Sequence, residues 1–424
     1  MTKIFKFGGA SVKDANAVKN VGNVIRLFND DLVVVISAMG KTTNALEKVV
    51  ESYLNKDGKA TENLQLIKDY HFTILNDLFE HKAHPIFTDI HNTFVEIEWE
   101  IEDEPQRDYD YVYDQIVSVG EVLSTKIVSA YLNENGIHNT WLDIRNVIQT
   151  DNTYRNARVD WKLTEELAQK NIMPLLNKTG QSIIITQGFI GSSSELFTTT
   201  LGREGSDFTA GILAYCLNAQ SVTIWKDVPG MLNADPKWFD DTEKLNNISY
   251  HEAVELAYYG ASVIHPKTIK PLHNKNIPLY VKSFVSPDHD GTVINENTTE
   301  DSLIPSFIFK MDQVLISISA KDYSFILEDN LSEIFGLFSQ LGVKINLMQN
   351  SAISFSVCVD FDAQKTMKLI DALKKDYKVL YNEGLELVTI RHYDDQTIKR
   401  VTENKKILVE QKSRNTARFV MLDK

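Results

Sequence analysis

The sequence predicts an α/β fold, a parallel-rich central sheet sandwiched by helices, followed by a smaller α+β region of ferredoxin type. The chain opens with a strand at Lys3–Phe7, a turn at Gly8–Gly9, a helix at Asp14–Phe28 and a buried β-branched strand at Leu32–Ile36. Strand, turn, helix and buried strand in this order form a βαβ unit, which places both strands in a parallel sheet. A polar, linker-like stretch at 295–305 separates this pattern from a second one.

The rest of the first region continues the alternation of helices and strands. Residues 60–105 are polar, follow a helical period and contain no glycine, which predicts a helical insertion at about 45–110. An amphipathic helix follows at Tyr113–Leu132, interrupted only by Gly120. The pattern then predicts strands at Ser182–Gln187, Ser221–Trp225 and Ile277–Val281, and helices at Ser206–Leu217 and Asn247–Gly260.

The second region has the order strand, helix, strand, strand, helix, strand, which is typical of a ferredoxin-like sandwich. The expected strands are Gln313–Ser319, Val343–Met348, Ser354–Asp360 and Leu385–Arg391, with helices at Leu331–Leu341 and Ala363–Lys374. The final Asp394–Lys424 predicts a short helix and a hairpin, too little for a full domain. We therefore expect two domains, at 1–294 and 305–424.

Composition limits the class of partner. The 424 residues include 44 Lys and Arg against 58 Asp and Glu, a formal net charge of −14. This argues against a nucleic-acid partner, which needs clustered cations, but allows a local anion site. Cys216 and Cys358 lie in apolar runs and indicate a reducing compartment and no disulfide framework. With no signal-peptide pattern and no run approaching ~20 apolar residues, we expect a cytoplasmic protein without a membrane partner.

The first candidate site is the loop Lys6–Ser11. Its glycines follow a strand and precede a helix, so backbone N–H groups can approach phosphate oxygens, and Lys6 can reach the same anion. An ordinary strand–helix turn with a solvated lysine explains the same residues, because short glycine motifs are common. The loop matches neither a dinucleotide-binding nor a P-loop motif.

The second candidate is Thr198–Asp207, a hydroxyl-rich loop that leads into a helix N-terminus, again a favourable place for an anion. Arg203 offers a planar fork for a carboxylate. Alternatively, Ser206 or Asp207 caps the helix, a role that is compatible with binding.

Three further features are less specific. Trp225–Gly230 and Asp235–Lys237 combine tight turns with the end of a buried strand, where ligands bind in open α/β sheets. Plain turn chemistry explains the same residues. Glu121 lies in an apolar helix stretch and needs a core salt bridge, which the residues alone favour, or a ligand ammonium. His265 before Pro266 is interpreted as a helix terminator. No His/Cys cluster has metal-ligand spacing, so metal ligands stay unknown.

Together and in this order, the motifs resemble those of the aspartate kinases within the amino-acid kinase family. The region after the linker resembles the ACT regulatory domains of these enzymes. The matching stretches cover nearly the whole chain: KFGGASV (6–12), VVVISAMGKTTN (33–44), SVGEVLST (118–125), GFIG (188–191), TTTLGREGSDFTA (198–210), WKDVPGMLNADP (225–236) and GASVIHPKTI (260–269).

The resemblance implies transfer of the γ-phosphate of ATP, with Mg²⁺, to the side-chain carboxylate of L-aspartate. It implies Lys6 and Asp207 as catalytic residues. Implied aspartate contacts are Ser37, Thr43, Glu121, Arg203, Glu204, Gly205 and Ser206. Implied ATP contacts are Lys6, Phe7, Gly8, Gly9, Lys226, Asp227, Leu232, Lys237 and Ser262.

The resemblance also implies a homodimer through the ACT region and an amino-acid effector, lysine or threonine. The expected effector contacts are Ser324, Leu327, Asn330, Asn346, Asn350 and Ser351. The second ACT unit is shortened to roughly Leu385–Lys424. Other departures from the family pattern are Ala10 for Thr, Glu204 for Gly, Leu232 for an aromatic residue, Ser262 for Lys and Asn346 for an acidic residue.

The implied chemistry suits these residue types. A side-chain carboxylate with an ordinary pKa of about 3.9 is ionised at neutral pH and needs no general base. The obstacle is the approach of an anion to a polyanion, so catalysis depends on positioning and charge neutralisation. Two alternatives stay open: another kinase of this fold, acting on glutamate, a carbamate or a nucleotide, and a non-catalytic amino-acid sensor.

Overall fold

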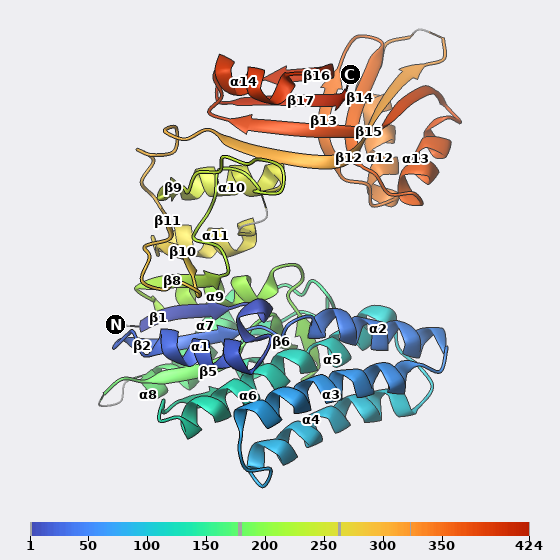
Figure 1. Cartoon of the computed structure of the whole chain (residues 1–424). Coiled ribbons are helices and arrows are strands. Elements are labelled where there is room, and N and C mark those ends of the chain that lie inside the picture. Colours follow the sequence, from blue (N-terminus) through green and yellow to red (C-terminus); the bar gives the residue numbers. More distant parts are fainter. Residues whose placement is uncertain (1, 177–179, 262–263, 323, 424) are drawn as a thin grey trace. The chain divides into compact units, whose positions relative to one another are not determined.

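The computed structural model describes residues 2–176, 180–261, 264–322 and 324–423. The chain forms two compact units (Figure 1). The first contains Met1–Met231, Lys244–Val254 and Val263–Thr298; the second contains Leu232–Glu243, Glu255–Ser262 and Thr299–Lys424. Two short segments predicted within the first domain thus cluster with the second unit. The α/β fold class with a C-terminal α+β region is confirmed.

The first unit is built on a mainly parallel sheet. Within the described residues eight strands follow the order β3-β5-β2-β1-β8-β10-β11-β9, and only β10 and β11 pair antiparallel. The strands are β1 (Thr2–Phe7), β2 (Asp31–Ile36), β3 (Thr140–Leu142), β5 (Ile183–Gln187), β8 (Ser221–Lys226), β9 (Asn247–Ser249), β10 (Leu279–Ser283) and β11 (Thr292–Asn295). The expected βαβ unit is present, since β1 pairs with β2 from Thr2↔Asp31 to Phe7↔Ile36.

Helices cover both faces of this sheet. On one face, alternate residues of β1 and β2, such as Phe5 and Val34, pack in a hydrophobic core against the helices that precede β3. On the opposite face, α9 contacts the sheet, and α7 and α11 pack on α9. The helical elements are η1 (Gly9–Val12), α1 (Ala15–Ile25), α2 (Thr42–Asn55), α3 (Ala60–Leu78), α4 (Pro85–Glu102), α5 (Tyr109–Val117), α6 (Val119–Glu134), η2 (Ile144–Asn146), α7 (Trp161–Asn171), α8 (Met173–Leu176), α9 (Gly205–Leu217), α10 (Tyr250–Tyr259) and α11 (Pro266–Asn274).

Several local predictions for this unit are corrected. The helix expected at Tyr113–Leu132 is two helices, which meet at Ser118 and not at Gly120. His265 starts a helix, because its Nδ1 accepts from the Lys267 N–H as the cap of α11. Residues 247–249, expected to be helical, form β9. The unit also contains a small third sheet, made of β4 (Gln149–Thr150), β6 (Ile190–Ser193) and β7 (Thr198–Thr200). Strand β7 of this sheet contacts α5.

The second unit is an antiparallel sheet with helices. Its order is β13-β14-β12-β15-β17-β16. The elements are β12 (Ser306–Ala320), α12 (Glu328–Gln340), β13 (Ile345–Asn350), β14 (Ser354–Asp360), α13 (Lys365–Leu373), β15 (Tyr377–Arg391), α14 (Asp395–Thr402), β16 (Lys405–Lys412) and β17 (Thr416–Asp423).

Two long strands serve both halves of this sheet. β12 pairs with β15 along its whole length, but the register shifts between Lys310 and Gln313, where Asp312 has φ +52°. On the N-terminal side, Ser306–Lys310 faces Leu387–Arg391 and so belongs to the half that contains α14. The half of the sheet that contains α14, β16 and β17 therefore includes the first part of β12, although β12 is the first strand in the sequence of this unit.

The segment Leu232–Glu243 packs on this same half. Phe239 stacks on Phe307 with ring centroids 4.5 Å apart, and Ala234 and Phe239 share a core with Val388 and Phe419. The backbone N–H of Phe307 donates to Asn233 O, which fixes the start of the segment.

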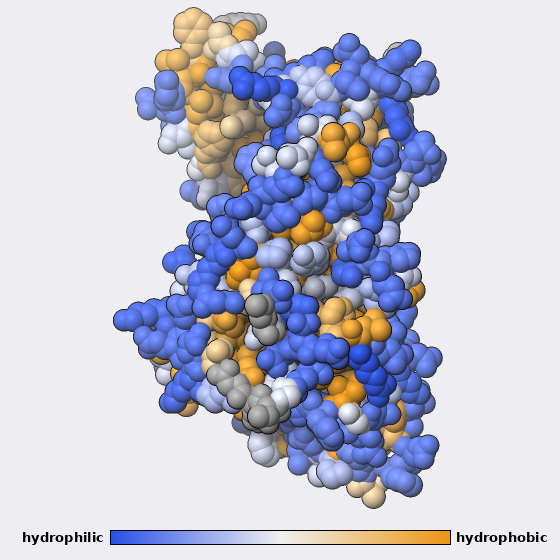
Figure 2. Space-filling model, turned by 90° about the vertical axis from the view of Figure 1, so that its left-hand side faces the viewer, coloured by the Kyte–Doolittle hydropathy of each residue, from blue (hydrophilic) through white to orange (hydrophobic). Residues whose placement is uncertain are grey.

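The face of the chain that Figure 2 shows is mainly hydrophilic. Figure 2 shows apolar atoms in separate patches, one of them at the top of the view, on the second unit. Cys216 and Cys358 are buried free thiols, as expected. None of the described helices combines the length and the apolar character that a membrane span needs.

Candidate active site

A cavity of about 490 Å³ opens at the carboxyl ends of β1, β2 and β8, the edge at which open α/β sheets bind ligands. It gathers residues from motifs far apart in sequence. Those that the sequence predicted are Lys6, Gly9, Ser37, Thr43, Glu121, Arg203, Glu204, Gly205, Ser206, Asp207 and Lys226. Those that it missed are Ala38, Gly40, Tyr113, Arg155, Phe189 and Gly202.

An ion pair occupies the floor of the cavity. Lys6 lies near the end of β1, and its Nζ is 2.6 Å from Asp207 Oδ1, in the first turn of α9. The Lys6 side chain is 12% exposed and that of Asp207 is 5% exposed. Lys6 is thus held by a partly buried carboxylate and presents its charge to the cavity. Asp207 does not cap α9: the cap position is Glu204, and the capping role considered for Ser206 and Asp207 is not observed.

Glu121 lies on α6 and is 3% exposed. Burial raises the pKa of this carboxyl to about 8, although a hydrogen bond from the Ala38 backbone and the charge of Lys6 act in the opposite direction. Glu121 Oε2 has no hydrogen-bond partner among the described residues. The core salt bridge that the sequence favoured is absent from the described part of the chain. A buried acceptor without a partner is well placed for a cationic ligand.

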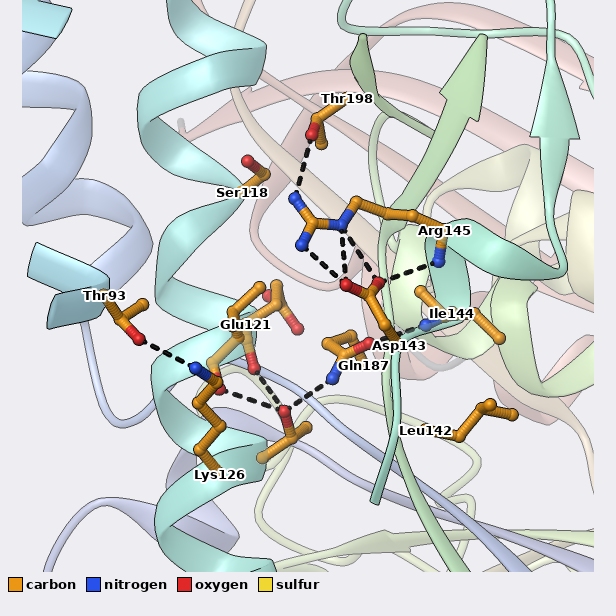
Figure 3. A network of polar contacts seen from close by, with 12 residues as sticks. Thr93, Ser118, Glu121, Lys126, Leu142, Asp143, Ile144, Arg145, Gln187 and Thr198 are labelled. Carbon is orange, nitrogen blue, oxygen red and sulfur yellow. Dashed lines mark hydrogen bonds and ion pairs between the residues drawn. The ribbon is translucent and has the colours of Figure 1, made fainter. Parts of the chain in front are cut away.

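A polar network fixes the helix that carries Glu121 (Figure 3). Thr125 Oγ1 donates to the Glu121 carbonyl at 3.0 Å and accepts from Gln187 Nε2 at 2.8 Å. Gln187, at the end of β5, also accepts from the Ile144 N–H at 2.8 Å. One helix and one strand end are thereby joined by buried bonds, which are costly to break.

Two glycines allow the loops around the cavity to approach closely. A Cβ on Gly9 would lie 2.7 Å from Gly40 O and 2.8 Å from Ala38 O. A Cβ on Gly205 would lie 2.6 Å from Phe189 Cδ2. A side chain at Gly9 would clash with the backbone of residues 38–40, and one at Gly205 would clash with Phe189, so the packing explains both glycines.

The loop before α9 carries a charged and strained segment. Glu204 has φ +54°, a left-handed conformation that costs a non-glycine residue roughly 1 kcal/mol. Its Oε2 is buried without a hydrogen-bond partner among the described residues. Arg203 is exposed, lines the cavity and forms no hydrogen bond or ion pair with any described residue. Both side chains are therefore available to a ligand.

Arg155 was not predicted by the sequence, because it lies in a polar loop without a pattern. Its φ is +63°, and its guanidinium lies 4.6 Å from the ring centre of Tyr113. Its backbone N–H donates to both oxygens of buried Asp114, which also accept from the backbone N–H and Oγ1 of Thr200. Burial raises the pKa of Asp114 to about 6 despite these donors. Asp114 thus joins α5, the Arg155 loop and β7.

The remaining ATP-contact predictions have separate outcomes. Phe7 is fully buried and stacks on Trp225, so only its backbone can face a ligand. Gly8 immediately precedes the lining residue Gly9, and Asp227 is exposed directly after β8. Leu232 and Lys237 belong to the second unit. Ser262 lies outside the described residues.

The second unit has its own cavity, of about 530 Å³. Three of the expected effector residues, Leu327, Asn350 and Ser351, line it together with Phe325, Ile326, Glu328, Leu331 and Ala352. Ser324 and Asn330 do not line it: the Ser324 N–H donates to Asp322, and Asn330 donates to Tyr377.

Asn346 does not line this cavity either. It is 7% exposed and its amide is saturated by a polar network: Nδ2 donates to Gln313 and Asp360, and Oδ1 accepts from Lys310. Its carbonyl accepts from Arg418 of β17 at 2.6 Å, so the residue joins the two halves of the sheet. This is a structural role.

No group of three or more His, Cys, Asp or Glu side chains in the described ranges is arranged to hold a metal ion.

Comparisons with known proteins agree with this geometry. Residues 1–283 match the model of the amino acid kinase family. Lysine-sensitive aspartokinase 3 of Escherichia coli is 31% identical over 396 residues, which are 91% of this chain and 86% of that protein. The structure of E. coli aspartokinase III with lysine and aspartate aligns with this chain at a TM-score of 0.84 and 29% identity. The alignment covers 100% of this chain and 96% of that one. The structure of the same enzyme with aspartate and ADP gives a TM-score of 0.82, 29% identity and coverage of 99% and 96%.

Proposed function

The chain belongs to the aspartokinases of the amino acid kinase family, and from this premise we propose how its cavity performs the reaction. It is an aspartate kinase, which phosphorylates the side-chain carboxylate of L-aspartate. The observation that carries the residue assignments is the single cavity in which the Lys6–Asp207 ion pair, buried Glu121 and unpaired Arg203 meet.

Lys6 neutralises the phosphoryl group during its transfer. Both the nucleophile and the donor are anions, so a fixed ammonium stabilises the transition state more than the separated reactants. Asp207 lies 2.6 Å from the Lys6 Nζ and is a positioning residue for it, not a general base. The aspartate carboxylate needs no base, because it is ionised at neutral pH.

Glu121 and Arg203 recognise the two charges of the aspartate backbone. The substrate ammonium supplies the partner that Glu121 Oε2 lacks, and the Arg203 guanidinium donates to the α-carboxylate. Ser37, Thr43 and Ser206 line the same cavity and provide hydroxyl groups around the substrate. Oriented in this way, the side-chain carboxylate of aspartate faces Lys6.

ATP is the phosphoryl donor, and its phosphates bind near Gly9, Lys6 and Lys226. Asp207 and Glu204 line this cavity, and their carboxylates are the protein oxygens that would hold a Mg²⁺ ion brought with the nucleotide. Such an ion would supply positive charge to the phosphates. ADP is present in the structure of the E. coli relative, which supports a nucleotide in this fold.

The second unit binds an amino-acid effector in its 530 Å³ cavity and mediates a homodimer. The E. coli relative is named lysine-sensitive, which makes lysine the first effector to test before threonine. Glu328 is the charged side chain of this cavity and fits an ammonium. Exposed Phe325, Leu327, Met348 and Ile353 provide the apolar surface that a dimer interface requires.

Aspartate-dependent ADP release by the full chain tests the assignment. We expect turnover with aspartate and none with glutamate, bicarbonate plus ammonia, or a nucleoside monophosphate. Arg203→Ala should raise the KM for aspartate about tenfold or more, since it removes a charged hydrogen-bond pair. Arg107→Ala removes an exposed arginine from the same unit and is the matched control. Equal KM values in the two variants would contradict the Arg203 assignment.

A further inference from the structure

A second cavity of the first unit, of about 600 Å³, has no part in the reaction described above. It is formed by α7, α9, α11 and the loop 156–159, and it shares no lining residue with the catalytic cavity. Its volume lies within the range of small-molecule sites. We call it the α9 cavity.

The charges of the α9 cavity are all of one sign. Arg158, Lys267 and Lys270 line it, and none of its described lining residues carries a carboxylate. Across the described ranges these three cations form no ion pair, and Lys267 Nζ donates to the neutral amide of Asn156. The charge of Arg158 also acts on Asp151, which lies outside the lining. Lys267 and Lys270 are therefore the two cations that an anion in this cavity would meet.

Three aromatic side chains form another part of the lining of this cavity, which we call its aromatic wall. Trp161 contacts Phe208 and Tyr215 edge to face, with ring centroids 6.1 Å and 5.3 Å apart. Trp161 is 36% exposed, so part of its indole is free to contact a ligand ring. Cations beside an aromatic wall select a ligand that is both planar and negatively charged.

We propose that the α9 cavity is a binding site for a planar aromatic anion, with Lys267 and Lys270 holding a carboxylate or phosphate group and Trp161 stacking on the ring. The site is adjacent to the catalytic cavity in the chain: Asn156 follows Arg155, and Phe208 follows Asp207. An occupant therefore contacts the same loop and the same helix turn that carry catalytic-cavity residues. The proposal does not depend on the residue roles assigned to the reaction.

Calorimetric titration of the full chain tests the site with phenyl phosphate and benzoate, and with inorganic phosphate and phenol as partial probes. We expect at least one aromatic anion to bind saturably, and both partial probes to bind at least tenfold more weakly. The difference between phenyl phosphate and benzoate identifies the preferred anionic group. No saturable binding of either aromatic anion at millimolar concentration would overturn the proposal, as would equal binding of inorganic phosphate.

Two variants locate the binding. The double variant Lys267→Gln/Lys270→Gln should bind the aromatic anion about tenfold more weakly than the parent. The matched control, Lys162→Gln/Lys170→Gln, removes two exposed lysines of α7 that do not line the cavity and should leave the affinity unchanged. An equal loss of affinity in the two double variants would show that only the net charge matters, and it would refute the site. Displacement of the probe by a non-hydrolysable ATP analogue would also refute it, because the cavity would then belong to the nucleotide site.

Discussion

The catalytic cavity and the effector cavity are built in different ways, although their volumes are similar. The catalytic cavity has buried or partly buried ionisable groups, Lys6, Asp207 and Glu121, held by an ion pair or by a hydrogen bond from the backbone. The effector cavity is lined mainly by apolar side chains, of which Phe325 and Leu327 are exposed, and Glu328 is its charged group. Phosphoryl transfer needs charges in fixed positions, whereas an effector needs only a difference in affinity between two states. The predictions below test this contrast.

The largest effect is expected at Lys6. Lys6→Met should lower kcat about 100- to 1,000-fold, because the ammonium acts on charge that develops in the transition state. The KM for aspartate should change much less. Lys3→Met removes a lysine of the same strand that pairs with Asp30 away from the cavity, and it should retain kcat within about threefold. Steady-state kinetics on folded variants, verified by circular dichroism, make the comparison, and full turnover of the Lys6 variant would contradict the mechanism.

Glu121 should determine how aspartate binding depends on pH. With a pKa of about 8 in the free enzyme, this carboxyl is mostly protonated at pH 7 and must ionise to pair with the substrate ammonium. The KM for aspartate should therefore fall as pH rises from 6 to about 9 and level off above that. Glu121→Gln should raise KM about 10- to 100-fold and abolish this dependence. A pH profile of KM that is unchanged in the variant would exclude Glu121 as the group responsible.

Asp114 should stabilise the wall of the catalytic cavity. Asp114→Asn replaces one acceptor oxygen with a donor that faces the N–H groups of Arg155 and Thr200. The free energy of unfolding of the first unit should fall by about 1–3 kcal/mol at pH 7. In the parent, Asp114 has a folded pKa of about 6, above its ordinary 3.8, so its contribution favours folding most at acid pH and declines from pH 4 to 6. Asp110→Asn, which affects an exposed ion pair with Arg155, is the control and should change stability by under about 1 kcal/mol.

The smallest effect is expected in the effector cavity. Glu328→Gln should raise the half-inhibitory concentration of lysine about two- to fivefold and leave kcat without effector unchanged, because an exposed charge contributes little. Asn346→Ala should lower the thermal stability of the second unit and leave the half-inhibitory concentration of lysine unchanged. The reason is that the Asn346 amide already bonds to Lys310, Gln313 and Asp360. Inhibition curves with lysine and threonine measure the first effect and calorimetry the second. A larger change in inhibition for Asn346→Ala than for Glu328→Gln would reverse the assignment.

The two cavities were predictable to different degrees. Lys6, Gly9, Arg203 and Asp207 stand in short motifs whose residue types the chemistry requires, and the structure brings them together in one cavity. Arg155 carried no signal, because only its backbone bond to Asp114, distant in sequence, places it there. In the second unit Leu327, Asn350 and Ser351 line the cavity, but Ser324, Asn330 and Asn346 do not.

The sequence by itself determined the local features of this protein: the first βαβ unit, the glycine turns and the charged residues at the ends of strands, all of which depend on neighbouring residues. Only the tertiary structure decided the burial of Glu121, the ion pair of Lys6 with Asp207 and the contribution of Ser306–Lys310 to the second half of the C-terminal sheet. These features arise from pairings between segments far apart in the chain. Desolvation and long-range strand pairing are properties of the packed chain, which no local pattern encodes.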